Sequence, residues 1–260
     1  MKNAQISKCL KIKSVLILLL VLFITAGLKA QIHVVQYMKV KDGKFSEYLD
    51  VEKAWSKLHQ KLVDEGNLTG WTLYGKMFGG SYDEYDYITV NIYHDWETYE
   101  KPFPDNFYVD NLGEEVVNKT GEVRDLIRTE IYVNRLLAEN TKPNKIIQLA
   151  YMKVDHRDFQ KYIDVEEKYY KPFHEGLIDA GARNSWGIYQ RITPWGGDFN
   201  FVAVNGFDKL SQPNAVSGDA FDAPWEKAAQ GVPEDQIDKE TYDAREMVHS
   251  EYWRQIMTVE

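Results

Sequence analysis

The residues best suited to chemistry lie on one expected helix near the start of the chain. Four of them follow at spacings of four, three and four residues, which puts them on one helix face: Tyr48, Glu52, Trp55 and His59. An acid on an aromatic face loses water, and desolvation disfavours its charged form, so Glu52 is a candidate catalytic base or hydrogen-bond donor. The alternative is a structural carboxylate that accepts hydrogen bonds from a neighbouring Tyr or Trp, or from Arg124.

The same stripe returns in the second part of the chain. At an offset of 114 residues it reads Tyr162, Glu166, Tyr169 and Phe173. Glu166 is therefore the second candidate base, with Arg245 as its alternative structural partner. Because this alignment puts Phe173 where the first stripe has His59, we expect Glu166 to have the more apolar surround and the more raised pKa.

The expected strands supply further candidates for ligand contact. Trp71 and Trp186 lie on the second strand of each half, and Glu130 and Glu251 are expected to begin the fourth. Aromatic walls with a few polar groups are typical of a small-molecule pocket, and equally of an aromatic interface between two sheets. The predicted ligand contacts are Tyr48, His59, Trp71, Tyr162, Trp186, Glu130 and Glu251.

Motifs for metals and common cofactors are missing from the sequence. The histidines show no HxH or HExxH spacing, and Cys9 is the only cysteine, so no metal site is predicted. GxGxxG after a strand, GxxxxGK[ST] and GxSxG do not occur either. The pairs Gly79-Gly80 and Gly196-Gly197 are interpreted as turn residues. No cofactor is predicted.

Four sequence blocks occur twice in the same order, which indicates a duplication. YMKVKDGKFSEYLDVE, from Tyr37, shares nine of sixteen positions with YMKVDHRDFQKYIDVE, from Tyr151. The other blocks pair GNLTGWTLY with GARNSWGIY, YDYITVN with FNFVAVN, and RDLIRTE with REMVHSE. The polar segment AENTKPNK between the copies is interpreted as a linker. The predicted organisation is a leader at 1–30, one unit at 31–138, a linker at 139–145 and a second unit at 146–260.

Each copy is predicted to contain four strands and two helices. In the first copy the strands are HVVQYMKV, WTLYGKMF, YDYITVNIY and TEIYVNRLL. One helix starts at Phe45 and is stopped by Gly66, and the other runs from Leu112 to Ile127. The order strand, helix, strand, strand, helix, strand is the ferredoxin-like split βαβ motif. Such a sheet leaves one face open, and a second copy would cover it.

This tandem arrangement resembles the dimeric α+β barrel superfamily, which includes NIPSNAP-like, EthD-like and antibiotic-biosynthesis-monooxygenase-like proteins. The resemblance covers nearly all of Ile32 to Glu260 and rests on element order. It implies an α+β fold in which tandem ferredoxin-like (βαββαβ) units form an intramolecular dimeric α+β barrel. Several relatives hold haem between sheet and helices, and the haem-degrading branch uses an asparagine, tryptophan and histidine set. That set has no counterpart here residue by residue, so no axial ligand is named.

The first thirty residues have the pattern of a secretory signal. A basic leader precedes the apolar run SVLILLLVLFITAGL, and Ala30 precedes a polar start. The run is shorter than the usual spanning helix of about 20 apolar residues. Retention of the leader as an anchor is the alternative. Cleavage after Ala30 predicts a secreted or periplasmic protein that has no cysteine and no membrane association.

The cleaved chain would be strongly acidic. The full sequence has 31 basic and 40 acidic residues, and five lysines but no acids lie in residues 1–30, which leaves a net charge of −14. Because this charge repels phosphate backbones, no nucleic-acid partner is predicted.

Two classes of function remain open at this point. The first is an exported protein with a small-molecule-binding cavity in each unit, for which self-association is possible. The alternative is a cofactor-independent monooxygenase, decarboxylase or isomerase that uses Glu52 or Glu166 as base, or a haem-binding relative. Fold alone does not decide between binding protein and enzyme.

Overall fold

The computed structural model describes residues 31–80, 83–214 and 217–260 of the 260-residue chain. Residues from Gln31 to Glu260 form one compact unit. The expected signal peptide at residues 1–30 lies outside the described residues. Within the described part, no helix combines the length and the apolar character needed to cross a membrane.

The first half of this unit, residues 31–138, has the strand and helix order expected of a ferredoxin-like motif. Its elements are β1 (Ile32–Val40), α2 (Phe45–Asp64), β2 (Gly70–Met77), β3 (Tyr87–Tyr93), α3 (Trp96–Tyr99), α4 (Phe107–Leu112), α5 (Glu114–Val123) and β4 (Arg124–Leu137).

The second half, residues 146–260, repeats the order with a longer helical part. Its elements are β5 (Ile146–Lys153), a 3-10 turn (His156–Asp158), α6 (Phe159–Val165), a π-helical turn (Glu166–Tyr170), α7 (Lys171–Asp179), β6 (Ser185–Thr193), β7 (Phe201–Phe207), a 3-10 turn (Gln212–Asn214), α8 (Asp219–Ala229), α9 (Glu234–Ala244) and β8 (Glu246–Val259).

The eight strands form one closed barrel in the order β1-β3-β2-β8-β5-β7-β6-β4. Each half contributes four neighbouring strands, and all neighbours are antiparallel. Two seams join the halves, because β2 pairs with β8 and β4 pairs with β6. The structure thus confirms the predicted fold class, a dimeric α+β barrel within one chain. Closure leaves the barrel without the open sheet edges that each half alone would expose.

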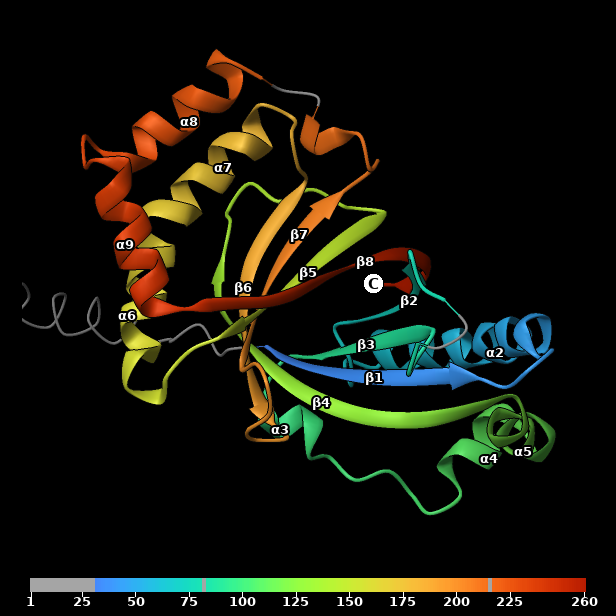
Figure 1. The fold of residues 1–260 in the computed structure, drawn as a ribbon. Helices are drawn as coiled ribbons and strands as arrows, with labels where there is room; N and C mark the ends of the chain where they lie inside the picture. Colours follow the sequence, from blue (N-terminus) through green and yellow to red (C-terminus); the bar gives the residue numbers. More distant parts are fainter. Residues whose placement is uncertain (1–30, 81–82, 215–216) are drawn as a thin grey trace, which may run out of the picture. The chain divides into compact units, whose positions relative to one another are not determined.

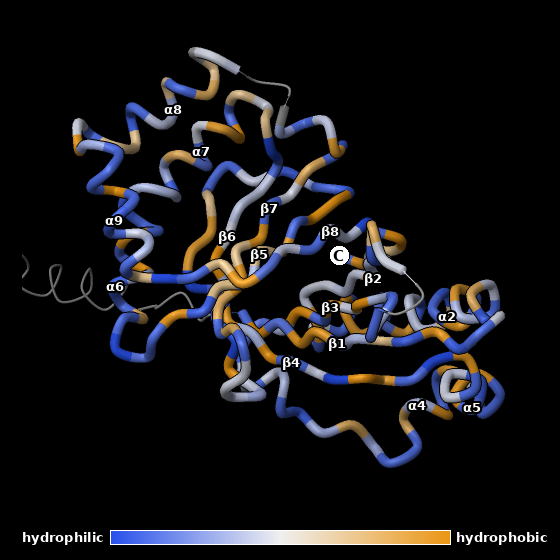
Figure 2. Tube along the Cα trace, viewed as in Figure 1, coloured by the Kyte–Doolittle hydropathy of each residue, from blue (hydrophilic) through white to orange (hydrophobic). Residues whose placement is uncertain are grey.

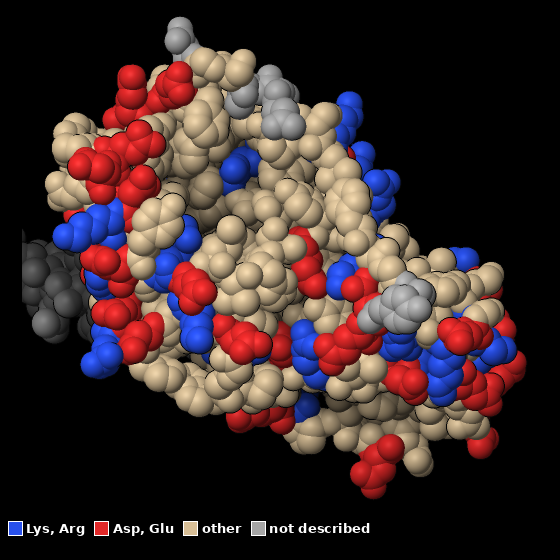
Figure 3. Space-filling model, in the orientation of Figure 1, with Lys and Arg blue, Asp and Glu red and all other residues tan. Residues whose placement is uncertain are grey.

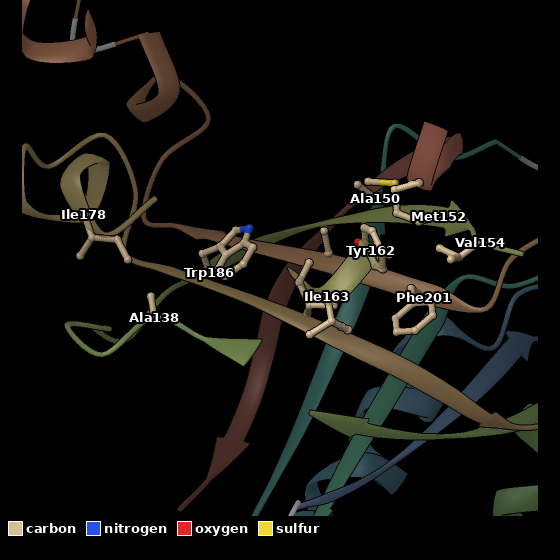
Figure 4. Packing of buried hydrophobic residues seen from close by; sticks show 12 residues of the cluster. Ala138, Ala150, Met152, Val154, Tyr162, Ile163, Ile178, Trp186 and Phe201 are labelled. Atoms are coloured by element: carbon tan, nitrogen blue, oxygen red, sulfur yellow. The ribbon is translucent and has the colours of Figure 1, made fainter. Parts of the chain in front are cut away.

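Alternation along the strands divides the side chains between the barrel interior and the outer, helix-covered face. On β1, Tyr37 belongs to the interior cluster, whereas Met38 packs outward with Tyr48 of α2. Figure 1 shows α2, α4 and α5 beside the strands of the first half, and α6 to α9 beside those of the second. Figure 4 shows the outer cluster of the second half, in which Trp186 and Ile163 come from a strand and a helix. The molecule therefore has an interior core and two outer cores.

The second helix of the first half ends earlier than predicted. We predicted a helix from Leu112 to Ile127, but α5 ends at Val123 and β4 begins at Arg124. Backbone pairing explains the difference, since Arg124 lies opposite Val40 and β1 continues to its end as a paired strand. Short polar and apolar stretches alternate along β4 (Figure 2). Glu130 on β4 and Glu251 on β8 therefore lie in the middle of their strands, and not at the beginning as predicted.

The π-helical turn corrects the alignment of the two helix stripes. A π-turn inserts one residue into an α-helix, so the offset between the halves rises from 114 to 115 after Glu166. Two equivalent contacts support this register: the Trp55 indole donates to the Thr120 hydroxyl, and the Tyr170 hydroxyl bonds that of Thr241. His174, and not Phe173, is therefore the structural equivalent of His59. The expectation that the second stripe lacks a histidine was wrong.

Candidate functional site

The barrel interior contains a cavity of about 200 Å³ between the two halves. Its wall is mostly aliphatic and aromatic, and it is lined by His33, Val35, Tyr37, Tyr74, Ile88, Val90, Ile92, Tyr132, Asn144, Ile147, Leu149, Tyr151, Ser185, Tyr189, Val202 and Val204. Tyr74, Tyr189 and Asn144 also line a surface groove of about 720 Å³. The shared residues place the mouth of the cavity beside the segment that links the two halves.

His33 is the polar group that distinguishes the cavity wall. It lies on β1, is 9% exposed, and its ring meets that of Tyr189 edge-on at 4.9 Å. The Nε2 atom is buried and has no hydrogen-bond partner among the described residues. Burial lowers the pKa of His33 to about 4, so the ring is neutral at physiological pH. The equivalent position on β5 is Ile147, so the wall has an imidazole on the side of the first half and an apolar side chain on the side of the second half.

Buried tyrosines form the floor of the cavity. Tyr37 and Tyr151, equivalent residues of β1 and β5, are each 1% exposed, and the Tyr151 hydroxyl donates to Glu251 at 3.1 Å. The Tyr132 hydroxyl donates to Glu130 at 2.5 Å. Burial, with help from the adjacent carboxylates, raises the pKa of all three tyrosines. The hydroxyls therefore stay protonated, and those of Tyr132 and Tyr151 donate their protons to Glu130 and Glu251.

Two ion pairs below this floor cross the seams between the halves. Glu130 of the first half accepts from Nη1 of Arg191 of the second half at 3.1 Å, and both side chains are almost fully buried. Reciprocally, Glu251 lies 3.0 Å from Nζ of Lys76. Arg191 and Lys76 occupy equivalent strand positions, so the two pairs are related by the internal duplication. They tie the barrel closed at both seams.

The helix glutamates lie elsewhere, between the helices and the outer face of the barrel. Glu52 is 2% exposed and lies 3.1 Å from Nε of Arg124, although the N–H is not directed at the oxygen. Glu166 is 3% exposed and accepts from Nε of Arg245 at 3.1 Å. Burial raises the pKa of both carboxyls, and the facing arginine opposes the rise. Each helix glutamate thus faces the arginine that was named as its possible structural partner.

The aromatic residues of each helix stripe also lie between the helices and the outer face of the barrel. The ring of His59 stacks on Trp71 at 4.7 Å with an interplanar angle of 9°, and its Nδ1 lies 2.8 Å from the carbonyl oxygen of Trp55. The ring of His174 lies 4.8 Å from that of Trp186. Tyr48, Trp71, Tyr162 and Trp186 are all at most 2% exposed.

The predicted site residues are thus distributed over three places. Tyr48, Glu52, His59 and Trp71 lie together under α2, and Tyr162, Glu166 and Trp186 lie together under α6 and α7. Glu130 and Glu251 instead lie inside the barrel.

His33 and the tyrosines of the cavity floor were not identified as site residues from the sequence. The alternation of HVVQYM could have indicated one face for His33, Val35 and Tyr37, but it does not say which face becomes the lumen.

The described side chains were compared with the requirements of a metal ion and of haem. Among residues 31–80, 83–214 and 217–260, no cluster of three His, Cys, Asp or Glu side chains could hold a metal ion. A porphyrin between His59 or His174 and the sheet would have to replace the Trp71 or Trp186 ring that packs there. The residues present therefore do not fit haem in this arrangement.

The fold and the interior cavity together define a single-chain dimeric α+β barrel protein. No match was found among family models or among curated proteins. Among solved structures, a "putative monooxygenase" from Lactobacillus acidophilus is similar, with 9% identity, coverage of 89% of this chain and 96% of that chain, and a TM-score of 0.54. Another "putative monooxygenase", from Fusobacterium nucleatum, has 9% identity, coverage of 89% and 95%, and a TM-score of 0.55. A haem-binding protein from Thermus thermophilus has 10% identity, coverage of 88% and 92%, and a TM-score of 0.47.

Proposed function

We propose that this protein binds a small, uncharged, largely aromatic molecule inside the barrel. The observation that carries the proposal is the interior cavity with the unpartnered Nε2 of His33 in its wall. Apolar cavities of about 150 Å³ accept benzene, so about 200 Å³ suits one ring with small substituents. A charged ligand would lose its hydration in this apolar wall without a compensating counter-ion.

The polar groups of the wall select a hydroxyl group on the ligand. Neutral histidine offers one N–H and one lone pair, and a hydroxyl can satisfy either tautomer. The tyrosine hydroxyls at the floor supply additional acceptors, because Tyr132 and Tyr151 donate their own protons to Glu130 and Glu251. A phenol carries both features, an apolar ring and one hydroxyl.

Calorimetric titration with p-cresol tests the proposal. The His33→Ile variant copies the residue at the equivalent position, Ile147, and removes one neutral hydrogen bond of about 1 kcal/mol. We expect the Kd for p-cresol to rise about three- to tenfold. His94→Leu, which changes an exposed histidine, is the control and should leave the Kd unchanged. Equal affinity of the wild type and His33→Ile, or no binding of any one-ring phenol, would contradict the proposal.

A second candidate function is oxygenation of a bound phenol that carries an activated CH₂ group, and the names of two structures with TM-scores above 0.5 favour it. Without a cofactor, the substrate must itself supply the electrons, as when an activated CH₂ group and O₂ give C=O and water. Glu52 and Glu166 are poorly suited as the base, because each faces an arginine and lies outside the barrel. Incubation with ¹⁸O₂ and mass spectrometry should place one labelled oxygen in the product, while unlabelled product would refute oxygenation. An absorbance scan of the purified protein tests haem through its Soret band.

The proposal includes export, with cleavage after Ala30. The leader sequence supports this part, and intact mass of the protein expressed with its full leader tests it. A protein that begins at Gln31 in the exported fraction is expected. A mass that retains residues 1–30 in the membrane fraction would show an anchor.

A further inference from the structure

The outer face of the barrel differs between the two halves at one set of equivalent positions. In the first half, Val34 of β1 lies between Asn91 of β3 and Ile131 of β4. In the second half, Gln148 takes the place of Val34 and lies between Asn205 and Tyr252. The asparagine is common to both halves, whereas two apolar residues have become polar in the second half.

A third substitution puts a cation at this place. Leu68 of the first half is 4% exposed and packs with Leu58 and Leu62. Its equivalent in GARNSWGIY is Arg183, whose Nη1 donates to the Oδ1 of Asn205. The second half thus has a hydrogen-bonded polar group where the first half has part of an apolar core.

Arg183 has no acidic partner in the part of the chain that the structure describes. Its buried Nε has no hydrogen-bond partner, and no interaction of this residue with a carboxylate is present among the described residues. Because Asn205 takes Nη1, the Nε–Nη2 edge of the guanidinium makes no hydrogen bond to a described residue. This edge presents two parallel N–H groups, the geometry that binds a carboxylate or phosphate in bidentate fashion. Burial lowers the pKa of Arg183 to about 10, and the group is still a cation at neutral pH.

His174 brings a second unsatisfied group close to Arg183. Its Nδ1 is buried without a partner among the described residues, and burial, together with the positive charge of Arg183, lowers the pKa of the imidazole. Asn205 donates to the Oε1 of Gln148 at 3.4 Å, which leaves the Gln148 amide NH₂ as a further donor. Figure 3 shows a hollow in the surface beside α7 and α8. A buried cation without a counter-ion is costly unless a ligand supplies the charge.

We propose that Arg183, with Asn205, Gln148 and His174, forms a binding site for the carboxylate or phosphate group of a small molecule on the outer face of the second half. The site is separate from the barrel cavity and is absent from the first half, where Leu68 and Val34 close the same place. One half of the duplicated chain thus has an apolar core at this place, and the other has an anion site.

Thermal unfolding and calorimetry of the whole protein, with inorganic phosphate and with benzoate as separate probes, test the site. At least one probe should bind and raise the melting temperature, and the responding probe identifies phosphate or carboxylate as the preferred group. Arg183→Leu, which copies Leu68, should lose this response, with a Kd at least about tenfold higher, as expected for loss of a charge-assisted bidentate contact. Arg135→Leu removes an exposed arginine and the same charge, and should respond as the wild type does.

The variants also separate a binding role from a structural one. Without anion, Arg183→Leu should unfold at the same or a higher temperature than the wild type, because an uncompensated cation is removed. If Arg183→Leu fails to fold, Gln148→Val and Arg183→Lys should each weaken anion binding while the protein stays folded. Absence of a response to both probes in the wild type, or an equal response in Arg183→Leu and Arg135→Leu, would overturn the proposal.

Discussion

Replacing Glu130 by Gln should reveal how strongly the seam ion pairs hold the barrel closed. The carboxylate is 1% exposed, accepts from Arg191 across the seam, and lies 3.3 Å from Nε of Arg128. Glutamine keeps the shape but loses the charge, which leaves two arginines facing a neutral group. Breaking a buried ion pair on one side costs about 3–5 kcal/mol. We take about 3 kcal/mol for Glu130→Gln, because the amide oxygen still accepts one hydrogen bond.

The equivalent residue in the other half provides a matched comparison. Glu251 pairs with Lys76, but the two side chains are 11% and 14% exposed, against 2% and 6% for Glu130 and Arg191. Water therefore compensates more of the lost charge, and Glu251→Gln should cost about half as much as Glu130→Gln. For a chain of this length, about 3 kcal/mol corresponds to a decrease of about 6–12 °C in Tm.

Urea unfolding followed by tryptophan fluorescence and by far-UV circular dichroism measures both variants. The slope with urea should stay unchanged, so that the shift in midpoint gives the change in free energy of unfolding. A cost below about 1 kcal/mol for Glu130→Gln, or a larger cost for Glu251→Gln than for Glu130→Gln, would refute the reasoning that burial decides the strength of these pairs.

Three further outcomes are expected. The folded-state pKa of His33 is depressed from 6.5 to about 4, so the unfolded chain binds the proton first as the pH falls. The free energy of unfolding should therefore decrease between pH 6.5 and 4 by up to about 3 kcal/mol from this residue, and urea titrations of His33→Ile should show a flatter dependence. Glu52→Gln and Glu166→Gln should each unfold more easily yet keep p-cresol affinity in calorimetry; lost affinity at unchanged stability would make them functional. Residues 31–138 alone should dimerise or aggregate, since β2 and β4 lose their partners; a soluble monomer by light scattering would disagree.

Much of the fold could be predicted because the sequence contains two copies of the same unit. The repeated blocks starting at Tyr37 and Tyr151 gave the βαββαβ order, and the need to cover an open sheet gave the pairing of the halves. How the barrel closes depends on hydrogen bonds between backbone edges, which side-chain patterns do not specify. The π-helical turn at Glu166 could not be predicted either, because one inserted residue does not change the amino-acid composition of a helix recognisably.

The site was harder to predict than the fold for a physical reason. The stripe containing Glu52 was correctly placed on one helix face, and Arg124 was identified as a possible partner. A helix stripe that faces a sheet and a strand face that lines a lumen are both apolar, so polarity alone does not separate core from cavity. His33 and Arg183 become visible as candidates only when burial and the absence of partners are known.

A ligand in the barrel should contact His33, and nuclear magnetic resonance of ¹⁵N-histidine-labelled protein tests this contact most directly. In the presence of p-cresol, the Nε2 resonance of His33, assigned with His33→Ile, should shift and saturate with the Kd obtained by calorimetry. The resonances of exposed His94 and of His174, which lies outside the barrel, should stay in place. A saturating shift of His174 with the His33 resonance unmoved, or no shift of any histidine while p-cresol binds, would contradict the account.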